Sequence, residues 1–270
     1  MNKYAESNLM HTPLNCTPEQ AYKHITALRE LEEKSESMEL EDIFPPRPEP
    51  TIDQNGIGHM HVQGFLGNNL SRIEKQLGAT DYEDIVSEVS ELLEGARAVI
   101  MHINSGGGEA QGNTETAKVF AGIENLHTWS QGVMCSAAYN VGVMGSQIGI
   151  WDSSQVGSIG TILPFIDESG LWKMLGMEFE PITNEEGDLK GAGHGPSLTD
   201  QQRRSLQRNV QKLFDLFKNN VTGQREIADE TMRGQSFIGT DALDANLVDF
   251  VGSWTNFYSA ILTTVTTNQE

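Results

Sequence analysis

The chain has 270 residues, of which 38 are acidic and 18 are basic, so its formal net charge at pH 7 is −20. A surface this acidic repels phosphate backbones, which argues against nucleic-acid binding. Its two cysteines, Cys16 and Cys135, lie far apart, and we see neither a signal-peptide pattern nor an apolar run of about 20 residues, so we expect a soluble cytoplasmic protein without structural disulfides or a membrane span.

An N-terminal extension, residues 1–50, precedes the main domain. Thr17-Pro18-Glu19-Gln20 combines an N-cap, a proline at the first helical position and a capping-box glutamine, which predicts that one helix begins there. The proline-rich run from Phe44 to Pro50 cannot continue a helix and is typical of a stiff linker. The extension is a candidate docking arm or propeptide, since an acidic arm could fill a substrate groove.

From Ile52 onward, short apolar runs alternate with longer amphipathic ones, which indicates an α/β domain over residues 51–254 and a C-terminal tail over residues 255–270. The expected strands are His59–Val62, Ala98–Ile103, Gly132–Cys135, Ile148–Trp151, Ile159–Phe165 and Leu247–Val251. The expected helices are one opened by a capping box of Thr80 and Glu83, one within Glu109–Leu126, one from Ser136 to about Gly145, Leu198–Asn220 and Asp241–Asn246.

A glycine run, Gly106-Gly107-Gly108, follows the buried strand that ends at Ile103. Because glycines lack side chains, their backbone N–H groups can approach a ligand closely, as an oxyanion hole requires. The spacing fits neither a Walker loop nor a dinucleotide fingerprint, so phosphate binding is disfavoured. A purely structural turn is the alternative.

Ser136 stands between a short strand and a small-residue helix, and the alanines that follow leave room for a substrate. This placement suits a nucleophile, although a simple helix N-cap is the alternative. Cys135, in the strand, is expected to be inert core.

A serine nucleophile needs a base, and no histidine lies between Ser136 and His194. A neutral lysine can take that role if its surroundings lower its pKa. Lys173 and Lys190 are the only lysines between Ser136 and Lys212, and His194 is an alternative base near Lys190.

Five segments occur in the order expected of one peptidase family: INSGGG at 103–108, CSAAY at 135–139, VGSIG at 156–160, GDLKGAGHG at 187–195, and a closing segment at 237–249. The chain resembles the signal peptide peptidase A, or protease IV, serine peptidases, including the phage head-maturation (prohead) proteases. The resemblance spans about residues 52–254. The chain differs from the family pattern at Gly106, where the family has proline, and at Ala137 and Ala138, where the family has glycines.

The resemblance implies a Clp/crotonase-like fold and a Ser-Lys dyad. In it, Ser136 attacks the peptide carbonyl and Lys190 takes and returns the proton. The backbone N–H of Gly107 stabilises the oxyanion, with Gly108 as a second candidate, and Ser158 helps to orient the lysine. A ring or dome of identical subunits is also implied. Because three acidic residues lie close to Lys190 in sequence, a solvated lysine in a polar loop is the alternative.

We therefore expect a serine endopeptidase that acts on proteins or peptides without a metal or nucleotide cofactor. His59 and His61 share a strand face but lack an obvious third ligand, so a solvent-facing pair is favoured over a metal site. The phage branch of the family suggests capsid, scaffold or portal proteins as substrates during head assembly.

Three other functions are alternatives. One is a bacterial-type peptidase that degrades signal peptides without a membrane anchor. Another is an inactive assembly or scaffold protein on the same fold. An acyl-CoA enzyme is disfavoured, because nucleotide phosphates would need basic residues.

Overall fold

The structure, a computed structural model, describes residues 14–16, 26, 47–178, 180–192 and 197–267. The helix predicted from Thr17, the first residues of the proline-rich linker and His194 lie outside this part of the chain. Within it, no helix combines the length and the apolar character that a membrane span requires.

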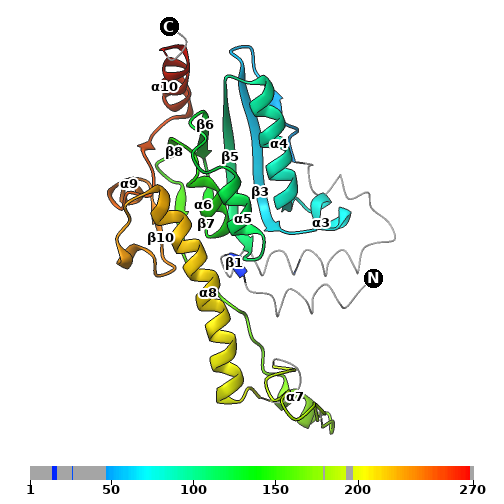
Figure 1. The fold of residues 1–270 in the computed structure, drawn as a ribbon. Coiled ribbons are helices and arrows are strands. Elements are labelled where there is room, and N and C mark those ends of the chain that lie inside the picture. Colours follow the sequence, from blue (N-terminus) through cyan, green and yellow to red (C-terminus); the bar gives the residue numbers. More distant parts are fainter. Residues whose placement is uncertain (1–13, 17–25, 27–46, 179, 193–196, 268–270) are drawn as a thin grey trace.

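A mainly parallel sheet forms the centre of the molecule, with strands and helices in alternation (Figure 1). Its longest strands, β3 and β5, pair in parallel from Ile57 opposite Ala98 to Leu66 opposite Gly108. The strands of the sheet are β3 (Ile57–Gly67), β5 (Ala98–Glu109), β6 (Leu126–Ser130), β8 (Ile148–Ile150) and β11 (Phe250–Val251). This arrangement confirms the α/β class.

The edge of β5 that faces away from β3 has two successive neighbours. Its first half pairs with β6, and Ser105 then pairs with Met134 of β7 (Val133–Cys135). The sheet continues from β7 through β9 (Gln155–Gly157), which is parallel, to β10 (Ser236–Ile238), which is antiparallel. The sheet therefore divides beside the C-terminal half of β5, and Ser136 follows directly on β7.

Helices cover the sheet and bury its apolar residues. Three of them are α4 (Tyr82–Gly95) and α6 (Ala137–Gly142), which contact β3 and β5, and α5 (Asn113–Val119), which packs between α4 and α6. All six residues of α6 are buried. The smaller elements are β1 (Leu14–Cys16), β2 (Thr51–Ile52), α3 (Arg72–Gln76), β4 (Thr80–Asp81), a 3-10 turn at Asp229–Thr231 and α9 (Thr240–Asp244). α6 is therefore a core helix that is packed on all sides, not a surface helix.

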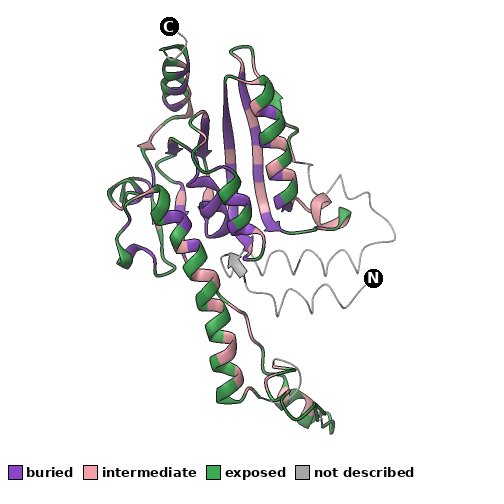
Figure 2. Ribbon diagram, viewed as in Figure 1, coloured by how far each residue is buried: buried purple, intermediate pink, exposed green. Residues whose placement is uncertain are grey.

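An arm projects from the sheet and ends in α7 (Ser169–Met174), as Figure 1 shows. The long helix α8 (Asp200–Gln224) returns from the arm to the sheet, and only its C-terminal residues Phe217, Asn220 and Val221 are buried. Thr199 caps α8 in a capping box with Gln202. Figure 2 shows the arm as mostly exposed or half-buried.

Three sequence predictions are wrong in their local detail. Ile159–Phe165 is not a strand, since the sheet uses Gln155–Gly157 instead and Ile162 makes only an isolated bridge. Asp81, rather than Thr80, caps α4, because the Thr80 hydroxyl donates to the carbonyl of Gln63. Glu109–Leu126 contains only a short helix, α5, because β5 extends through the glycines to Glu109.

The residues expected to form a C-terminal tail instead form a helix, α10 (Trp254–Thr267), that covers the second face of the sheet. Its buried side chains Phe257, Ile261 and Val265 join a cluster with Trp129 and Ile100. Each large apolar side chain so buried contributes about 1.5–3 kcal/mol to stability. The period-3.6 spacing of these three residues was the sequence signal for this helix.

His59 and His61 are not a solvent-facing pair, because both stack near His102 under α10. His59 Nδ1 lies 3.0 Å from His102 Nε2, and the rings of His61 and His102 stack with centroids 4.8 Å apart. Asp53 accepts from His59 at 3.3 Å and from Tyr258 of α10. The described residues contain no group of three or more His, Cys, Asp or Glu arranged to hold a metal ion.

Acid should destabilise the fold through these buried imidazoles. Burial, reinforced by His61 and His59, lowers the pKa of His102 to about 3. Histidine in the unfolded chain titrates near 6.5, so below that pH the unfolded state binds a proton that the folded state excludes. The His102 contribution is a loss of about 2 kcal/mol at pH 5. We expect the melting temperature to fall from pH 7 to pH 5, and to fall less in His102→Gln; equal slopes would contradict this.

Candidate active site

The backbone at Ser136 makes a sharp turn from strand into helix. Ser136 directly follows β7, is the N-cap residue of α6 and has φ 58° and ψ −121°, a conformation that non-glycine residues rarely adopt. Its N–H donates to the carbonyl of Gly157 at 2.7 Å, and its own carbonyl accepts from the N–H of Asn140 at 3.0 Å. Such a turn presents a serine hydroxyl at the edge of a sheet, as nucleophile elbows do.

The Ser136 side chain is buried, with 1% of the residue exposed. Its Oγ makes one long hydrogen bond, to the carbonyl of Gly160 at 3.5 Å. A bond of this length is weak, so the hydroxyl can exchange it for a better partner. Because neighbouring residues cover the Ser136 side chain, they must move before a peptide carbonyl can reach its oxygen.

The segment 157–160 wraps around this turn and brings Ser158 near the nucleophile. Gly157 and Gly160 both bond Ser136, and Ser158 lies between them with φ 51°. The Ser158 N–H donates to the carbonyl of Gln235 at 2.7 Å, which anchors the segment to the start of β10. The structure thus places Ser136 and Ser158 on adjoining segments.

The glycine run lies within β5 rather than in a loop. Ser105 of β5 pairs with Met134 of β7, so Gly107 and Ser136 each lie two residues beyond this pair on their own segments. The Gly107 N–H donates to Ser105 Oγ at 3.1 Å, and that hydroxyl donates to the carbonyl of Gly64 at 2.6 Å. Gly107 must therefore release Ser105 before its N–H can bind an oxyanion.

Gly108 is a glycine because neighbouring backbone occupies the space of a side chain. A Cβ at this position would lie 1.8 Å from the carbonyl oxygen of Leu66 on β3. The absence of a side chain therefore permits the close pairing of β3 and β5 at the site. Whether its N–H also lines an oxyanion hole stays a prediction.

The backbone N–H of Ala137 is a further candidate donor for the oxyanion, which reasoning from the sequence missed. It is the first residue of α6, and N–H groups in a first helical turn have no acceptor within the helix. The amide that follows a nucleophile in a strand–turn–helix elbow commonly serves as an oxyanion donor. That position directly after Ser136 was the available sequence signal.

Buried polar side chains fix the helix that carries Ser136. Asn113 of α5 donates through Nδ2 to the carbonyl of Ala137 at 2.9 Å, and Asn140 donates to Asn113 Oδ1 at 2.7 Å. The Tyr139 hydroxyl donates to the carbonyl of Leu247 at 2.9 Å. These residues position the nucleophile, and the signal for them was two polar side chains within a buried small-residue helix.

Lys190 lies on the projecting arm, in a turn, and its side chain is exposed. Its N–H donates to the carbonyl of Gly187 at 2.9 Å, and Gln202 of α8 donates to the carbonyl of Asp188 at 3.1 Å, which ties the turn to the helix. Among the described residues, no hydrogen bond or ion pair joins the Lys190 ammonium to another side chain. A single subunit therefore does not bring Lys190 to Ser136.

Cys135 is not a competing nucleophile. It is fully buried, and desolvation raises the pKa of its thiol to about 12. A thiol that stays protonated at neutral pH is inert. This agrees with the prediction that Cys135 belongs to the core.

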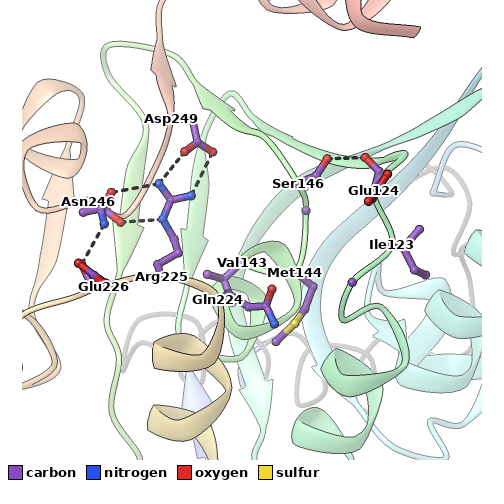
Figure 3. A pocket seen from close by; sticks show the side chains of 12 residues that line it. Ile123, Glu124, Val143, Met144, Ser146, Gln224, Arg225, Glu226, Asn246 and Asp249 are labelled. Atoms are coloured by element: carbon purple, nitrogen blue, oxygen red, sulfur yellow. Dashed lines mark hydrogen bonds and ion pairs between the residues drawn. The ribbon is translucent and has the colours of Figure 1, made fainter. Parts of the chain in front are cut away.

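A cavity of about 590 Å³ lies at the opposite end of α6 (Figure 3). Its cation, Arg225, is bound to both carboxylate oxygens of Asp249, at 3.0 and 2.7 Å. Ser146 Oγ lies 3.0 Å from His127 Nδ1, but the carbonyls of Glu124, at 2.7 Å, and Leu126, at 3.0 Å, also compete for its one hydrogen. With two carbonyl acceptors for its hydrogen, Ser146 is poorly placed to give that proton to His127, so this cavity is a poor candidate for the reaction.

The close approach at Gly108 makes a testable stability prediction. Gly108→Ala should lower the free energy of unfolding by about 3 kcal/mol, because backbone rather than a flexible side chain must move. The matched control is Gly170→Ala in α7, where nothing lies within 4 Å of the added carbon and the change should be neutral or slightly stabilising. Urea denaturation measures both, and equal stability of the two variants would contradict the account.

The comparisons with known proteins agree with this geometry. A model of peptidase family S49 matches residues 123–266, which include Ser136, the 156–160 segment and Lys190. The chain is 25% identical over 185 residues, 64% of its length, to a putative signal peptide peptidase SppA of Enterococcus faecium, and covers 53% of that protein. It is 22% identical over 222 residues, 79% of its length, to the head-tail preconnector protein GP5 of Enterobacteria phage P21, and covers 44% of it.

The chain thus spans about half the length of the curated relatives it matches. Among solved structures, the ClpP protease catalytic domain from Plasmodium falciparum matches 72% of this chain and 85% of its own, with 11% identity and a TM-score of 0.36. The family match covers more than half of the 270 residues and confirms the resemblance to the signal peptide peptidase A group. The chain belongs to peptidase family S49.

Proposed function

We propose that the chain is a serine endopeptidase in which Ser136 is the nucleophile and Lys190 is the general base. The observation that carries this proposal is the strained Ser136 turn beside the glycine run of β5, in a chain of a peptidase family. Strain is retained at a buried position when the surrounding structure holds it for function.

In this mechanism, Ser136 Oγ attacks the peptide carbonyl while Lys190 Nζ accepts its proton. The resulting oxyanion binds backbone N–H groups, for which Gly107, Gly108 and Ala137 are the candidates. The C–N bond then breaks as Lys190 returns the proton to the leaving amine. Water hydrolyses the Ser136 ester by the same proton route, and Ser158 helps to orient the lysine.

Lys190 should reach Ser136 from a neighbouring copy of the chain. The arm that carries Lys190 exposes large apolar side chains, including Met174 at 77% and Ile182 at 94% exposure. Exposed apolar clusters of this kind mark protein interfaces. A lysine acts as a base only when its surroundings favour the neutral amine, and docking of the arm against another subunit would supply that desolvation.

The substrate is proposed to be a capsid, scaffold or portal protein that is processed during phage head assembly. The similarity to a phage head-tail preconnector protein over 79% of this chain supports that setting. Degradation of signal peptides is the second candidate, supported by the similarity to a putative signal peptide peptidase. An inactive assembly protein would show no Ser136-dependent cleavage.

Substitution of either dyad residue should abolish peptidase activity. Ser136→Ala and Lys190→Ala should each lower kcat/KM on a casein-type substrate by about 10²–10⁴-fold, the usual range for loss of a nucleophile's base or of the nucleophile itself. Lys173→Ala, which removes an exposed lysine from the same arm, is the matched control and should keep activity. Full activity in Lys190→Ala would exclude it as the base.

Mixing the two inactive variants tests whether the lysine acts between subunits. When Ser136→Ala and Lys190→Ala chains are co-assembled in equal amounts, about one site in four should combine an intact serine with an intact lysine from its neighbour, by the statistics of a symmetric ring. Peptide hydrolysis should then return to about a quarter of the unmodified level. A mixture that stays inactive while assembling normally would place both residues in one subunit or discard the dyad.

A further inference from the structure

A short N-terminal strand lies against the glycine run of the active site. β1 pairs antiparallel with β5, with Leu14 opposite Glu109, Asn15 opposite Gly108 and Cys16 opposite Gly107. On the other edge of β5, Gly107 and Gly108 pair with β3. β1 therefore occupies the one edge of this glycine strand that the sheet leaves open (Figure 1).

The same edge of β5 pairs with β7, the strand that Ser136 directly follows. β7 pairs with the same edge of β5 at Ser105, and the chain then turns away from the sheet into Ser136. β7 pairs with β5 at Ser105, and β1 pairs with the residues just beyond it, Gly107 to Glu109. The last residue of β1, Cys16, stands opposite Gly107, two residues beyond the β5 residue that pairs with β7.

An extended peptide can add to an open sheet edge through main-chain hydrogen bonds. A peptide whose carbonyl is to meet both Ser136 and the amide of Gly107 must run along this edge. β1 has the extended conformation and the position of such a peptide, and it belongs to the same chain. A tethered segment competes at an effective concentration on the order of millimolar.

We propose that residues 14–16 form a built-in inhibitor, which fills the substrate's strand position beside Ser136 and keeps the site at rest. This inference rests on the proposed peptidase function. Two further features describe a resting site: Ser136 is buried, and the Gly107 N–H is bonded to Ser105 instead of facing an oxyanion. Release of the segment opens the edge to a substrate in trans.

Prolines introduced into β1 test the inhibitor in the full-length chain. Proline lacks the N–H that a ladder needs, and two in succession disrupt the pairing whichever residue faces β5. Leu14→Pro/Asn15→Pro should raise kcat/KM on a peptide substrate by about tenfold, as expected if one site in ten is open at rest. The matched control, Asn8→Pro/Leu9→Pro, carries the same change outside β1 and should leave the rate unaltered. Equal rates in the proline variant and the parent would overturn the proposal.

A binding measurement separates this inference from catalysis itself. In the Ser136→Ala background, a fluorescein-labelled peptide of residues 10–18 should bind the Leu14→Pro/Asn15→Pro chain and not the chain with an intact β1, as followed by anisotropy. Equal binding to both chains would overturn the inhibitor. If the peptide binds as expected but no form of the protein cleaves any substrate, the inhibitor's place stands and the proposed peptidase function fails.

Discussion

The hydrogen bond from the Ser136 N–H to the carbonyl of Gly157 is the constraint on which the site depends. It holds a serine at positive φ between a three-residue strand and a fully buried helix. A strained backbone of this kind costs on the order of 1–3 kcal/mol and persists only when its neighbours overdetermine it. Here the neighbours are α6, fixed through Asn113 and Tyr139, and the 157–160 segment, which is anchored at Gln235.

The parts of the proposed mechanism differ in how deeply they are buried. The nucleophile and the glycine strand belong to the buried sheet, whereas Lys190 belongs to an exposed arm. A base that becomes neutral only when the arm is docked would make activity depend on assembly, since desolvation requires a partner surface. If Lys190 acts from a neighbouring copy as proposed, a free subunit would therefore be inactive.

The open edge of β5 joins the two proposals. Unpaired edge strands attract other strands, and proteins commonly cover them. In this chain the cover, β1, pairs with the glycine run of the proposed site, so protection of the edge and inhibition of the site would be one contact. The glycine run serves this arrangement twice, because Gly108 permits close pairing with β3 while the same strand accepts β1 on its other edge.

The sequence by itself determined the α/β class and the junction at Ser136, because those depend on residues adjacent in the chain: a glycine run after a buried strand and a serine before a small-residue helix. The peptidase family was indicated by the resemblance of its ordered motifs. Only the tertiary structure decided which segments meet. It replaced the expected strand at Ile159–Phe165, placed α10 over the histidines, turned the Gly107 N–H toward Ser105 and separated Lys190 from Ser136. These outcomes depend on packing and strand pairing between residues that are distant in sequence. Local sequence patterns do not reveal the energies of such long-range contacts.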